Sequence, residues 1–107
     1  MEKRIKRYYV PMTETSFYVL FALREERHGY GIMQLVKELT DSEIILGAGT
    51  VYTSLSKMEK DGLIIFTRAE SNRKFYLLSD MGKEVLSLET KRIKRLYKNI
   101  TQEVNNE

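Results

Sequence analysis

Residues 49–62 read Gly-Thr-Val-Tyr-Thr-Ser-Leu-Ser-Lys-Met-Glu-Lys-Asp-Gly, and the rest of the chain is organised around this stretch. Its apolar side chains, Val51, Leu55 and Met58, recur at the spacing of one helical face. The opposite face carries small hydroxyls and lysines, so the helix backbone can approach a partner closely. Gly62 ends the helix, because glycine accepts the left-handed conformation that a helix end often needs. The pattern predicts a short helix able to enter a DNA groove, although an ordinary amphipathic surface helix has the same spacing.

The composition limits what the chain can be. Its 107 residues are enough for one domain with one core. The sequence has no cysteine, which excludes disulfides, thiolate chemistry and cysteine-ligated zinc and fits a cytoplasmic location. The longest strongly apolar run, residues 17–23, is far shorter than the ~20 residues that cross a membrane, so we expect no membrane partner.

The first twelve residues are unusually basic. Lys3, Arg4, Lys6 and Arg7 stand against one acid, so the net charge of residues 1–12 equals the +3 of the whole chain. A basic arm of this kind can lie along phosphates or in a minor groove. A solvated, disordered terminus has the same composition, and the sequence does not separate the two.

Two helices are expected before residue 49. The first begins at a Thr13 or Thr15 cap and runs through the apolar residues 17–23 into residues 24–27, which are strong helix formers. The glycines of residues 28–31 then break it. The only histidine lies in this break without acidic neighbours, which favours a structural or turn role over a catalytic or metal-binding one.

A second helix follows, with apolar residues at helical spacing between Ile32 and Leu39. Residues 43–47 are expected to form a short extended connector or a brief strand at the edge of the sheet. The second helix, this connector and the helix that begins at Gly49 or Thr50 then form a helix-turn-helix pair.

A β-hairpin is expected after Gly62. Residues 63–68 and 73–78 are rich in β-branched and aromatic side chains, and the polar residues 69–72 between them form the tip. Arg68, Arg73 and Lys74 flank this tip. They suit contact with backbone phosphates, although charges also protect the edges of natural sheets.

The last segment, residues 79–107, is expected to form one long helix capped by Ser79. Its apolar residues recur near a seven-residue spacing, which a domain of this size cannot bury on its own. We therefore predict a homodimer formed largely through this helix. The expected interface residues are Phe17, Leu86, Ile93, Leu96, Tyr97, Ile100 and Val104.

These elements predict a mainly α (α+β) chain. Residues 1–12 form the basic arm, residues 13–78 a winged helix-turn-helix with a two-stranded wing, and residues 79–107 the dimerisation helix. The sequence offers no catalytic residue, metal ligand set or cofactor motif: it has one histidine, no glycine-rich phosphate loop and no recognisable carboxylate pair.

Four motifs in register resemble the PadR family of transcriptional regulators. They are His28-Gly29-Tyr30-Gly31-Ile32, Gly49-Thr50-Val51-Tyr52, the run from Leu55 to Ile64, and Arg73-Lys74-Phe75-Tyr76 with Leu78, Ser79 and Gly82. The resemblance covers residues 12–88. It implies a winged helix-turn-helix of the short subgroup with a single C-terminal helix, dimerisation through that helix and repression at a palindromic operator.

The resemblance also implies which residues face DNA: Tyr30 at the start of the second helix, Thr50, Tyr52, Thr53 and Ser54 on the recognition helix, and Arg73 in the wing. Tyr52 has an alternative, which is to pack its ring under the wing. Some short members bind planar drugs through a tryptophan on the last helix, and the nearest position here is Ile93. The absence of tryptophan argues against flat-aromatic drug sensing, although Tyr97 and Phe17 could line a different pocket.

The function that follows is sequence-specific binding of a double-stranded DNA operator by a homodimer. Lys57, Arg68 and Lys74 join the implied residues as candidates for DNA contact, because they are cations on the recognition helix and the wing. Two alternatives stay open: a regulator that senses a small-molecule effector at the dimer interface, and a winged-helix protein-interaction module. The sequence gives neither the operator nor the effector.

Overall fold

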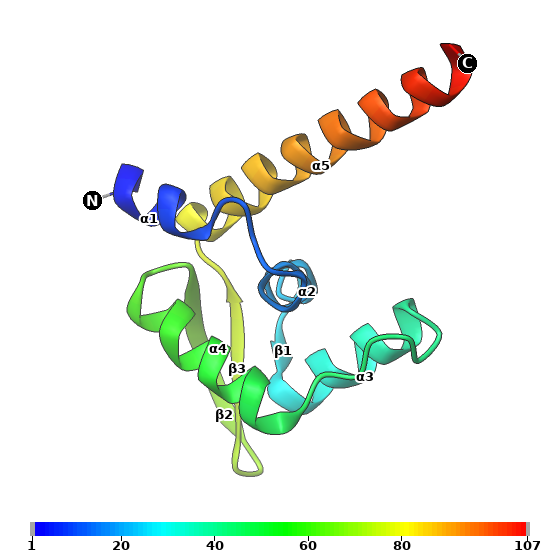
Figure 1. Ribbon diagram of the computed structural model, residues 1–107. Coiled ribbons are helices and arrows are strands. Elements are labelled where there is room, and N and C mark those ends of the chain that lie inside the picture. Colours follow the sequence, from blue (N-terminus) through cyan, green and yellow to red (C-terminus); the bar gives the residue numbers. More distant parts are fainter. Residues whose placement is uncertain (1, 107) are drawn as a thin grey trace.

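The computed structural model of the protein describes the backbone of residues 2–106 and the side chains of residues 3–102. Figure 1 shows a helical domain with a small sheet, from which one long helix projects. The elements are α1 (Glu2–Tyr9), α2 (Glu14–Ala22), β1 (Arg27–His28), α3 (Gly29–Leu39), α4 (Ala48–Lys60), β2 (Ile64–Glu70), β3 (Arg73–Leu78) and α5 (Asp80–Asn106).

The helix-turn-helix is formed by α3 and α4, which pack against α2. Val51, Leu55 and Met58 of α4 are all buried, as their spacing predicts. Gly62 follows α4 with a φ of +83°, a left-handed conformation that ends the helix as expected. The core is completed by apolar side chains of α2, α3, the sheet and the first turns of α5. One face of α4 is therefore fixed in the core and the opposite face is left outside.

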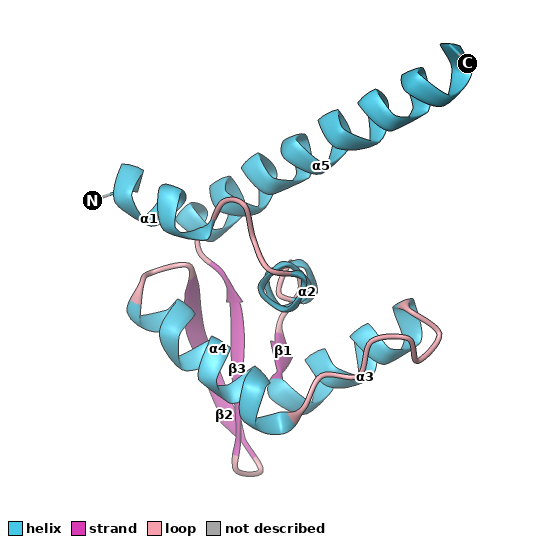
Figure 2. Ribbon diagram, in the orientation of Figure 1, coloured by secondary structure: helices cyan, strands magenta, loops and turns pink. Residues whose placement is uncertain are grey.

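The sheet is antiparallel with the strand order β1-β3-β2 (Figure 2). The hairpin of β2 and β3 is the wing, and its two strands were expected. Its tip is shorter than predicted: pairing continues to Glu70 and Arg73, and only Ser71 and Asn72 form the turn. Both turn residues have positive φ, the backbone that matches the twist of a two-residue hairpin turn.

The third strand, β1, was not predicted. The expectation that the first helix continues through residues 24–27 is wrong, because α2 ends at Ala22. Arg27 and His28 pair with Tyr76 and Phe75 of β3 instead, so hydrogen bonding to the wing outweighs the helix propensity of these residues. The option of an edge strand over residues 43–47 is also wrong, since no strand forms there.

The basic N-terminal segment is a helix, which rules out the disordered terminus and leaves DNA contact by this segment a prediction. Residues Glu2–Tyr9 form the helix α1, which lies along the first turns of α5 (Figure 1). Tyr9 is buried, Ile5 and Met12 pack against the core, and Lys6 pairs with Glu84 at 2.9 Å. Burial of its apolar residues fixes the position of α1 on the domain. The cations of this segment therefore lie on a packed helix.

The helix α5 begins in the core and then leaves it. Ser79 caps it as predicted, with its hydroxyl accepting from the Gly82 amide at 3.1 Å. Leu86, an expected dimer residue, is already buried within the protomer, whereas Phe17 is half-buried. Val104 lies outside the described side chains. The remaining expected interface residues are exposed, at 39% for Ile93, 41% for Leu96, 71% for Tyr97 and 62% for Ile100.

Within the described residues, no helix combines the length and the apolar character needed to cross a membrane. The helix α5 is long, but its lysines and arginines alternate with the exposed apolar residues.

Candidate nucleic-acid interface

The first half of α4 presents a small, polar surface to solvent. Thr50 and Thr53 are exposed, while Val51 between them is fully buried. Neither threonine hydroxyl makes a hydrogen bond with the described residues. Two short side chains with unsatisfied hydroxyls leave the α4 backbone open to close approach, and each hydroxyl can both donate and accept.

Tyr52, on α4, lines a groove together with residues of the wing. Its ring rests on Gly29, where an added Cβ would come within 2.8 Å of the tyrosine Cε1 atom. The absence of a side chain at Gly29 therefore sets how deeply the ring sits. Tyr52 is still 56% exposed, so the ring packs against the start of α3 and remains accessible. The ring of Tyr52 therefore packs on the start of α3, while its exposed part faces the groove that it lines together with wing residues.

Aromatic rings connect the start of α3 to the wing. His28 lies parallel to Tyr30, with ring centroids 6.4 Å apart, and meets the edge of Phe75 on β3 at 5.0 Å. The Arg73 guanidinium lies 5.7 Å from the centre of the Tyr30 ring and 3.3 Å from His28 Nε2. Arg73 and Tyr30, which the sequence separates by more than forty residues, are thus brought together.

His28 positions this group of residues. Its Nδ1 atom accepts from the Gly31 amide at 3.1 Å and caps α3, which confirms the structural role expected of it. Desolvation by burial lowers the pKa of His28, and the charges of Arg73 and Arg68 lower it further. The ring is therefore neutral at pH 7. Since Nδ1 accepts, the proton sits on Nε2, and Arg73 is a neighbouring cation rather than a donor to this ring.

The cations of the wing fall into two kinds. Arg68 pairs with Glu26 at 2.9 Å, also contacts Glu70, and lies 3.9 Å from the centre of the Phe75 ring. Arg73 and Lys74 are exposed and have no carboxylate partner among the described residues. Arg73 and Lys74 can bind a polyanion directly, whereas Arg68 would first have to give up its carboxylate partners.

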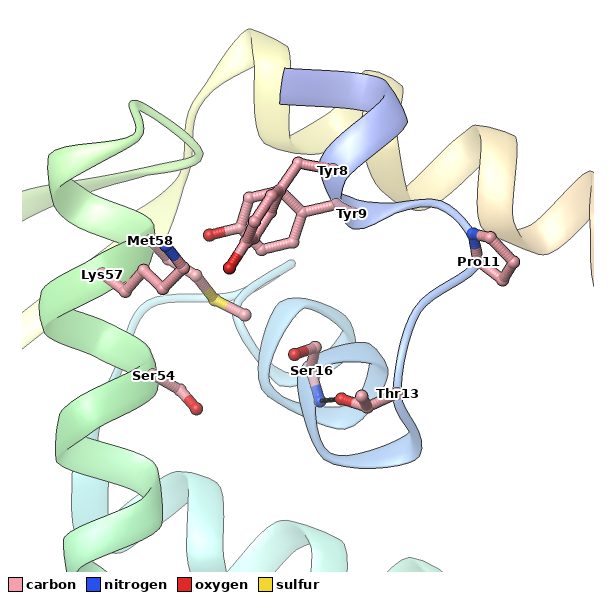
Figure 3. Close-up of a pocket in the computed structure, with 8 residues that line it drawn as sticks. All are labelled: Tyr8, Tyr9, Pro11, Thr13, Ser16, Ser54, Lys57 and Met58. Atoms are coloured by element: carbon pink, nitrogen blue, oxygen red, sulfur yellow. Dashed lines mark hydrogen bonds between the residues drawn. The ribbon is translucent and has the colours of Figure 1, made fainter. Parts of the chain in front are cut away.

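The second half of α4 points elsewhere. Ser54 and Lys57 line a cavity beneath α1, as Figure 3 shows. The Lys57 ammonium lies 4.5 Å from the centre of the Tyr8 ring and 3.7 Å from the Asp61 carboxylate. The Tyr8 hydroxyl and Asp61 raise the pKa of Lys57, with the bond to Tyr8 as the larger cause. These two expected DNA-facing residues are therefore turned toward α1.

Four of the nine expected DNA-facing residues line one groove between α4 and the wing, namely Tyr30, Tyr52, Arg73 and Lys74, and Thr50 and Thr53 are exposed on the same helix as Tyr52. We refer to this set as the α4–wing surface: Tyr30, Thr50, Tyr52, Thr53, Arg73 and Lys74. A groove of about 360 Å³ runs through it, and Asn72 at the wing tip also lines the groove. Sequence reasoning gave His28 a structural role without placing it in this groove, and it did not single out Gly29 or Asn72. The His-Gly pair directly before an apolar helix was the available signal, since a histidine can cap a helix and a glycine permits close packing.

A helix-turn-helix followed by a hairpin wing defines the winged helix-turn-helix class. The chain belongs to the PadR-like family of transcriptional regulators, whose model matches residues 19–88. The members of this family are transcriptional regulators and not enzymes. The sequence has no significant match among curated proteins.

Solved structures share the fold. A PadR family transcription regulator from Clostridium difficile R20291 is 26% identical, with a TM-score of 0.73, and the match covers 86% of this chain and 99% of that chain. A Streptococcus transcriptional regulator is 27% identical, with a TM-score of 0.67, over 82% of this chain and 89% of that chain. Bacillus subtilis PadR, solved in complex with operator DNA, is 28% identical with a TM-score of 0.62, over 70% of this chain and 45% of that chain.

Proposed function

We propose that this chain is a sequence-specific repressor that binds a palindromic operator as a homodimer. The observation that carries the proposal is the α4–wing surface, which combines exposed threonines on α4 with two wing cations that have no carboxylate partner among the described residues. An α-helix fits the major groove of DNA. Bacillus subtilis PadR, a relative with this fold, was solved with operator DNA. Thr50 and Thr53 would reach base edges, while Arg73 and Lys74 would hold the backbone of the duplex.

The start of α3 would hold a further phosphate. Tyr30 is 49% exposed beside the first amide groups of α3, and its hydroxyl accepts from Gln34 at 3.2 Å. The N-terminus of a helix carries partial positive charge and free N–H groups, which favour an anion. Arg73 lies next to Tyr30, so the same phosphate would meet both the helix end and a guanidinium.

The remaining candidates take a smaller part in this proposal. Arg68 is compensated by two carboxylates, and Ser54 and Lys57 face α1. We therefore assign Arg68 to shaping the wing. Ser54 and Lys57 would contact DNA only where the duplex reaches past the middle of α4.

Dimerisation is supported by the exposed apolar residues of α5. The spacing of one helical face is followed by Ile93, Leu96, Tyr97 and Ile100. These side chains are exposed, because the domain does not cover them. A second copy would cover them and place two recognition helices about 34 Å apart, one turn of DNA. Leu96→Glu should give a monomer in sedimentation velocity, while Lys98→Glu, also exposed on α5, should leave the dimer intact.

Selection of bound duplexes from a random pool tests the proposal directly. Recovery of a two-fold symmetric site is the expected result, with half-sites one helical turn apart. Recovery of no preferred sequence, or of an asymmetric site, would contradict it. Transcription from a promoter that carries the recovered site then tests the sign, and a repressor should lower it in proportion to occupancy.

A second candidate function, effector sensing at the dimer interface, has one favouring observation. A pocket of about 400 Å³ lies between α2 and α5, and its lining includes Phe17, Ile93, the buried Glu89 and its half-buried partner Arg92. Phe17 and Ile93 are also expected dimer residues, so an occupant would touch the seam. Fluorescence titration with 8-anilinonaphthalene-1-sulfonate tests this, because the dye should bind saturably and Ile93→Glu should abolish the binding.

A further inference from the structure

A groove of about 460 Å³ lies along the first half of α5, beside the end of β3 and the segment that follows α2. Its apolar lining includes Leu78 and Leu86, which are 4% and 8% exposed. The Thr90 hydroxyl, also in the lining, donates to the Leu86 carbonyl at 2.8 Å. The exposed apolar residues assigned to the dimer seam do not line this groove. We refer to it as the α5 groove, and it is separate from the proposed seam.

Four cations and no carboxylate are among the residues that line the α5 groove. All four are exposed, and none has a carboxylate partner among the described residues. A group of like charges without compensation attracts an anionic partner. The cations are Arg24, Lys83, Lys91 and Lys94.

The acids that neighbour these cations in the sequence are held elsewhere. Glu84 lies 2.9 Å from the Lys6 ammonium, and Glu25 lies 3.9 Å from the Arg27 guanidinium. Neither acid lines the α5 groove. The positive charge of the groove is therefore available to a partner from outside the protomer.

Arg24 is fixed in place at the groove. Its Nε atom donates to the Phe21 carbonyl at 2.9 Å, and its guanidinium lies 3.7 Å from the centre of the Phe21 ring. The remaining guanidinium N–H groups have the fork geometry that matches a carboxylate. A side chain held in this way loses little conformational freedom when it binds an acid.

The length of the α5 groove favours a peptide over a smaller anion. Lys83 and Lys94 lie about 16 Å apart along the helix axis, at 1.5 Å per residue. An extended peptide of about five residues covers this length. It can set carboxylates against the cations and apolar side chains against Leu78 and Leu86. A duplex backbone would use the cations and leave the apolar lining without a partner.

We propose that the α5 groove docks an acidic peptide segment of a partner protein, with apolar side chains interspersed among its acids. Figure 1 shows the first turns of α5 at the end of β3 that lies away from the wing tip. A duplex on the α4–wing surface would therefore leave the α5 groove open. The proposal does not depend on DNA binding, because the groove is formed within one protomer.

Isothermal titration calorimetry with the full chain and a synthetic peptide tests the docking. The probe alternates glutamate with leucine over about seven residues, which is long enough to pass both ends of the row of cations. We expect saturable binding with a Kd of about 0.1 mM, weakened by salt because the cations are exposed. Absence of saturable binding at about 1 mM peptide in low salt would overturn the proposal.

Two matched peptides separate charge from apolar contact. Replacing every glutamate by glutamine keeps the leucines, and replacing every leucine by serine keeps the charge. Each peptide should bind at least about tenfold more weakly, since the groove offers cations beside an apolar lining. Equal binding of either one would contradict a partner that is both acidic and apolar.

Paired variants locate the binding. Lys91→Gln combined with Lys94→Gln should weaken binding of the glutamate–leucine peptide about fivefold. Arg73→Gln combined with Lys74→Gln removes the same charge from the wing and should weaken it by less than about twofold. A larger loss in the wing variant than in the α5 variant would overturn the assignment to the α5 groove.

Ser87→Glu is a second test that leaves the cations in place. Ser87 is exposed in the groove lining, so the substitution leaves the core untouched. The new carboxylate would lie one helical turn from Lys83 and from Lys91, where it neutralises both. Peptide affinity should fall about fivefold or more, whereas Asn99→Glu, exposed on α5 outside the groove, should leave it unchanged. Equal effects of the two substitutions would also count against the groove.

Two other occupants give different results. A second copy of the chain in the groove would make Ser87→Glu change the sedimentation coefficient. A duplex in the groove would lose affinity in the Lys91 and Lys94 variant as strongly as the peptide does, even without the selected site. Either result overturns the peptide proposal. Failure of the duplex selection overturns the proposed function alone, because the peptide titration is made without DNA.

Discussion

The two ends of α4 carry similar residue types and use them differently. At the first end, Thr50 and Thr53 are exposed and the nearby cations Arg73 and Lys74 are unpaired. At the second end, Lys57 contacts Tyr8 and Asp61, and Asp61 also accepts from Tyr9. The polar side chains are thus without partners at the first end and contact α1 or Asp61 at the second end, where the Lys57 side chain is still 49% exposed. The difference separates a surface available to a polyanion from a surface that fixes the helix in place.

The largest expected effect concerns the open end. Arg73→Ala should weaken duplex binding by about 10- to 100-fold and lower the magnitude of the salt dependence by ~0.9, the value for one phosphate contact. Arg68→Ala is the matched control in the same wing, because Arg68 is already paired with Glu26 and Glu70. Fluorescence anisotropy across a series of salt concentrations measures both. Equal effects of the two substitutions would remove the distinction between free and compensated wing cations.

The next effect concerns what holds the covered end. Glu89 on α5 is buried, accepts from the Met12 amide and pairs with Arg92 through two contacts of 2.7 Å. Glu89→Gln should lower the free energy of unfolding at pH 7 by about 1–3 kcal/mol, since charge-assisted hydrogen bonds are lost. Urea denaturation at one protein concentration measures it. Lys91→Gln, exposed on the same helix, should change little.

The same substitution has a pH signature. The hydrogen bonds from Arg92 are the main cause that lowers the pKa of Glu89 below its ordinary value of 4.5, against the desolvation that raises it. A carboxyl whose pKa is lowered by folding stabilises the protein above its ordinary pKa, and this contribution is lost as the pH falls through the folded pKa. The stability difference between the original chain and Glu89→Gln should therefore shrink below about pH 4.5. A difference that stays constant from pH 7 to pH 3 would contradict the assignment.

A smaller effect tests how the open end is shaped. Gly29→Ala places a Cβ against the Tyr52 ring, which can swing outward at little cost in stability because it is partly exposed. Duplex affinity should fall by about fivefold, equivalent to roughly 1 kcal/mol. In a Tyr52→Ala background the same substitution should have no further effect, since the ring it displaces is absent. Additive losses in the double variant would show that Gly29 acts independently of Tyr52.

The covered end has its own single-atom test. Burial and the bond to Asp61 raise the pKa of Tyr9, so its hydroxyl is a donor throughout the accessible pH range. Tyr9→Phe removes only that donor and should lower the free energy of unfolding by about 0.5–1.5 kcal/mol. Tyr18→Phe is the control, because the Tyr18 hydroxyl makes no hydrogen bond with the described residues. Duplex affinity should change less in Tyr9→Phe than in Gly29→Ala.

The contrast between the two ends also separates what the sequence predicts from what it does not. The buried face of α4, the Gly62 stop and the Ser79 cap depend on local spacing and local hydrogen bonds, which are visible along the chain. The strand β1 is two residues long and exists only because β3 lies beside it, so no periodicity reveals it. The predicted length of α2 was wrong for the same reason, because residues 27–28 pair with β3 instead of continuing the helix.

The sequence pattern did not reveal the N-terminal helix α1, because charged residues dominate this segment. Ile5 and Tyr9 are four residues apart, the spacing of a helical face, and both pack on the domain. Once α1 is placed, the direction of Lys57 follows from its contacts with Tyr8 and Asp61. Tertiary contacts therefore decide which cations of a basic helix remain available to DNA. Composition alone would assign all of them to DNA binding.

The smallest expected effect addresses that point. Lys57→Met should weaken duplex binding by less than about threefold, because an ammonium that is held by Tyr8 and Asp61 gives little to a phosphate. Lys74→Met, at an exposed lysine without a carboxylate partner, should weaken it several-fold more. Anisotropy titrations at two salt concentrations measure both, and only Lys74→Met should alter the salt dependence. If Lys57→Met matched Lys74→Met, the duplex would have to displace α1 from Lys57 on binding, and the covered end of α4 would be part of the DNA interface after all.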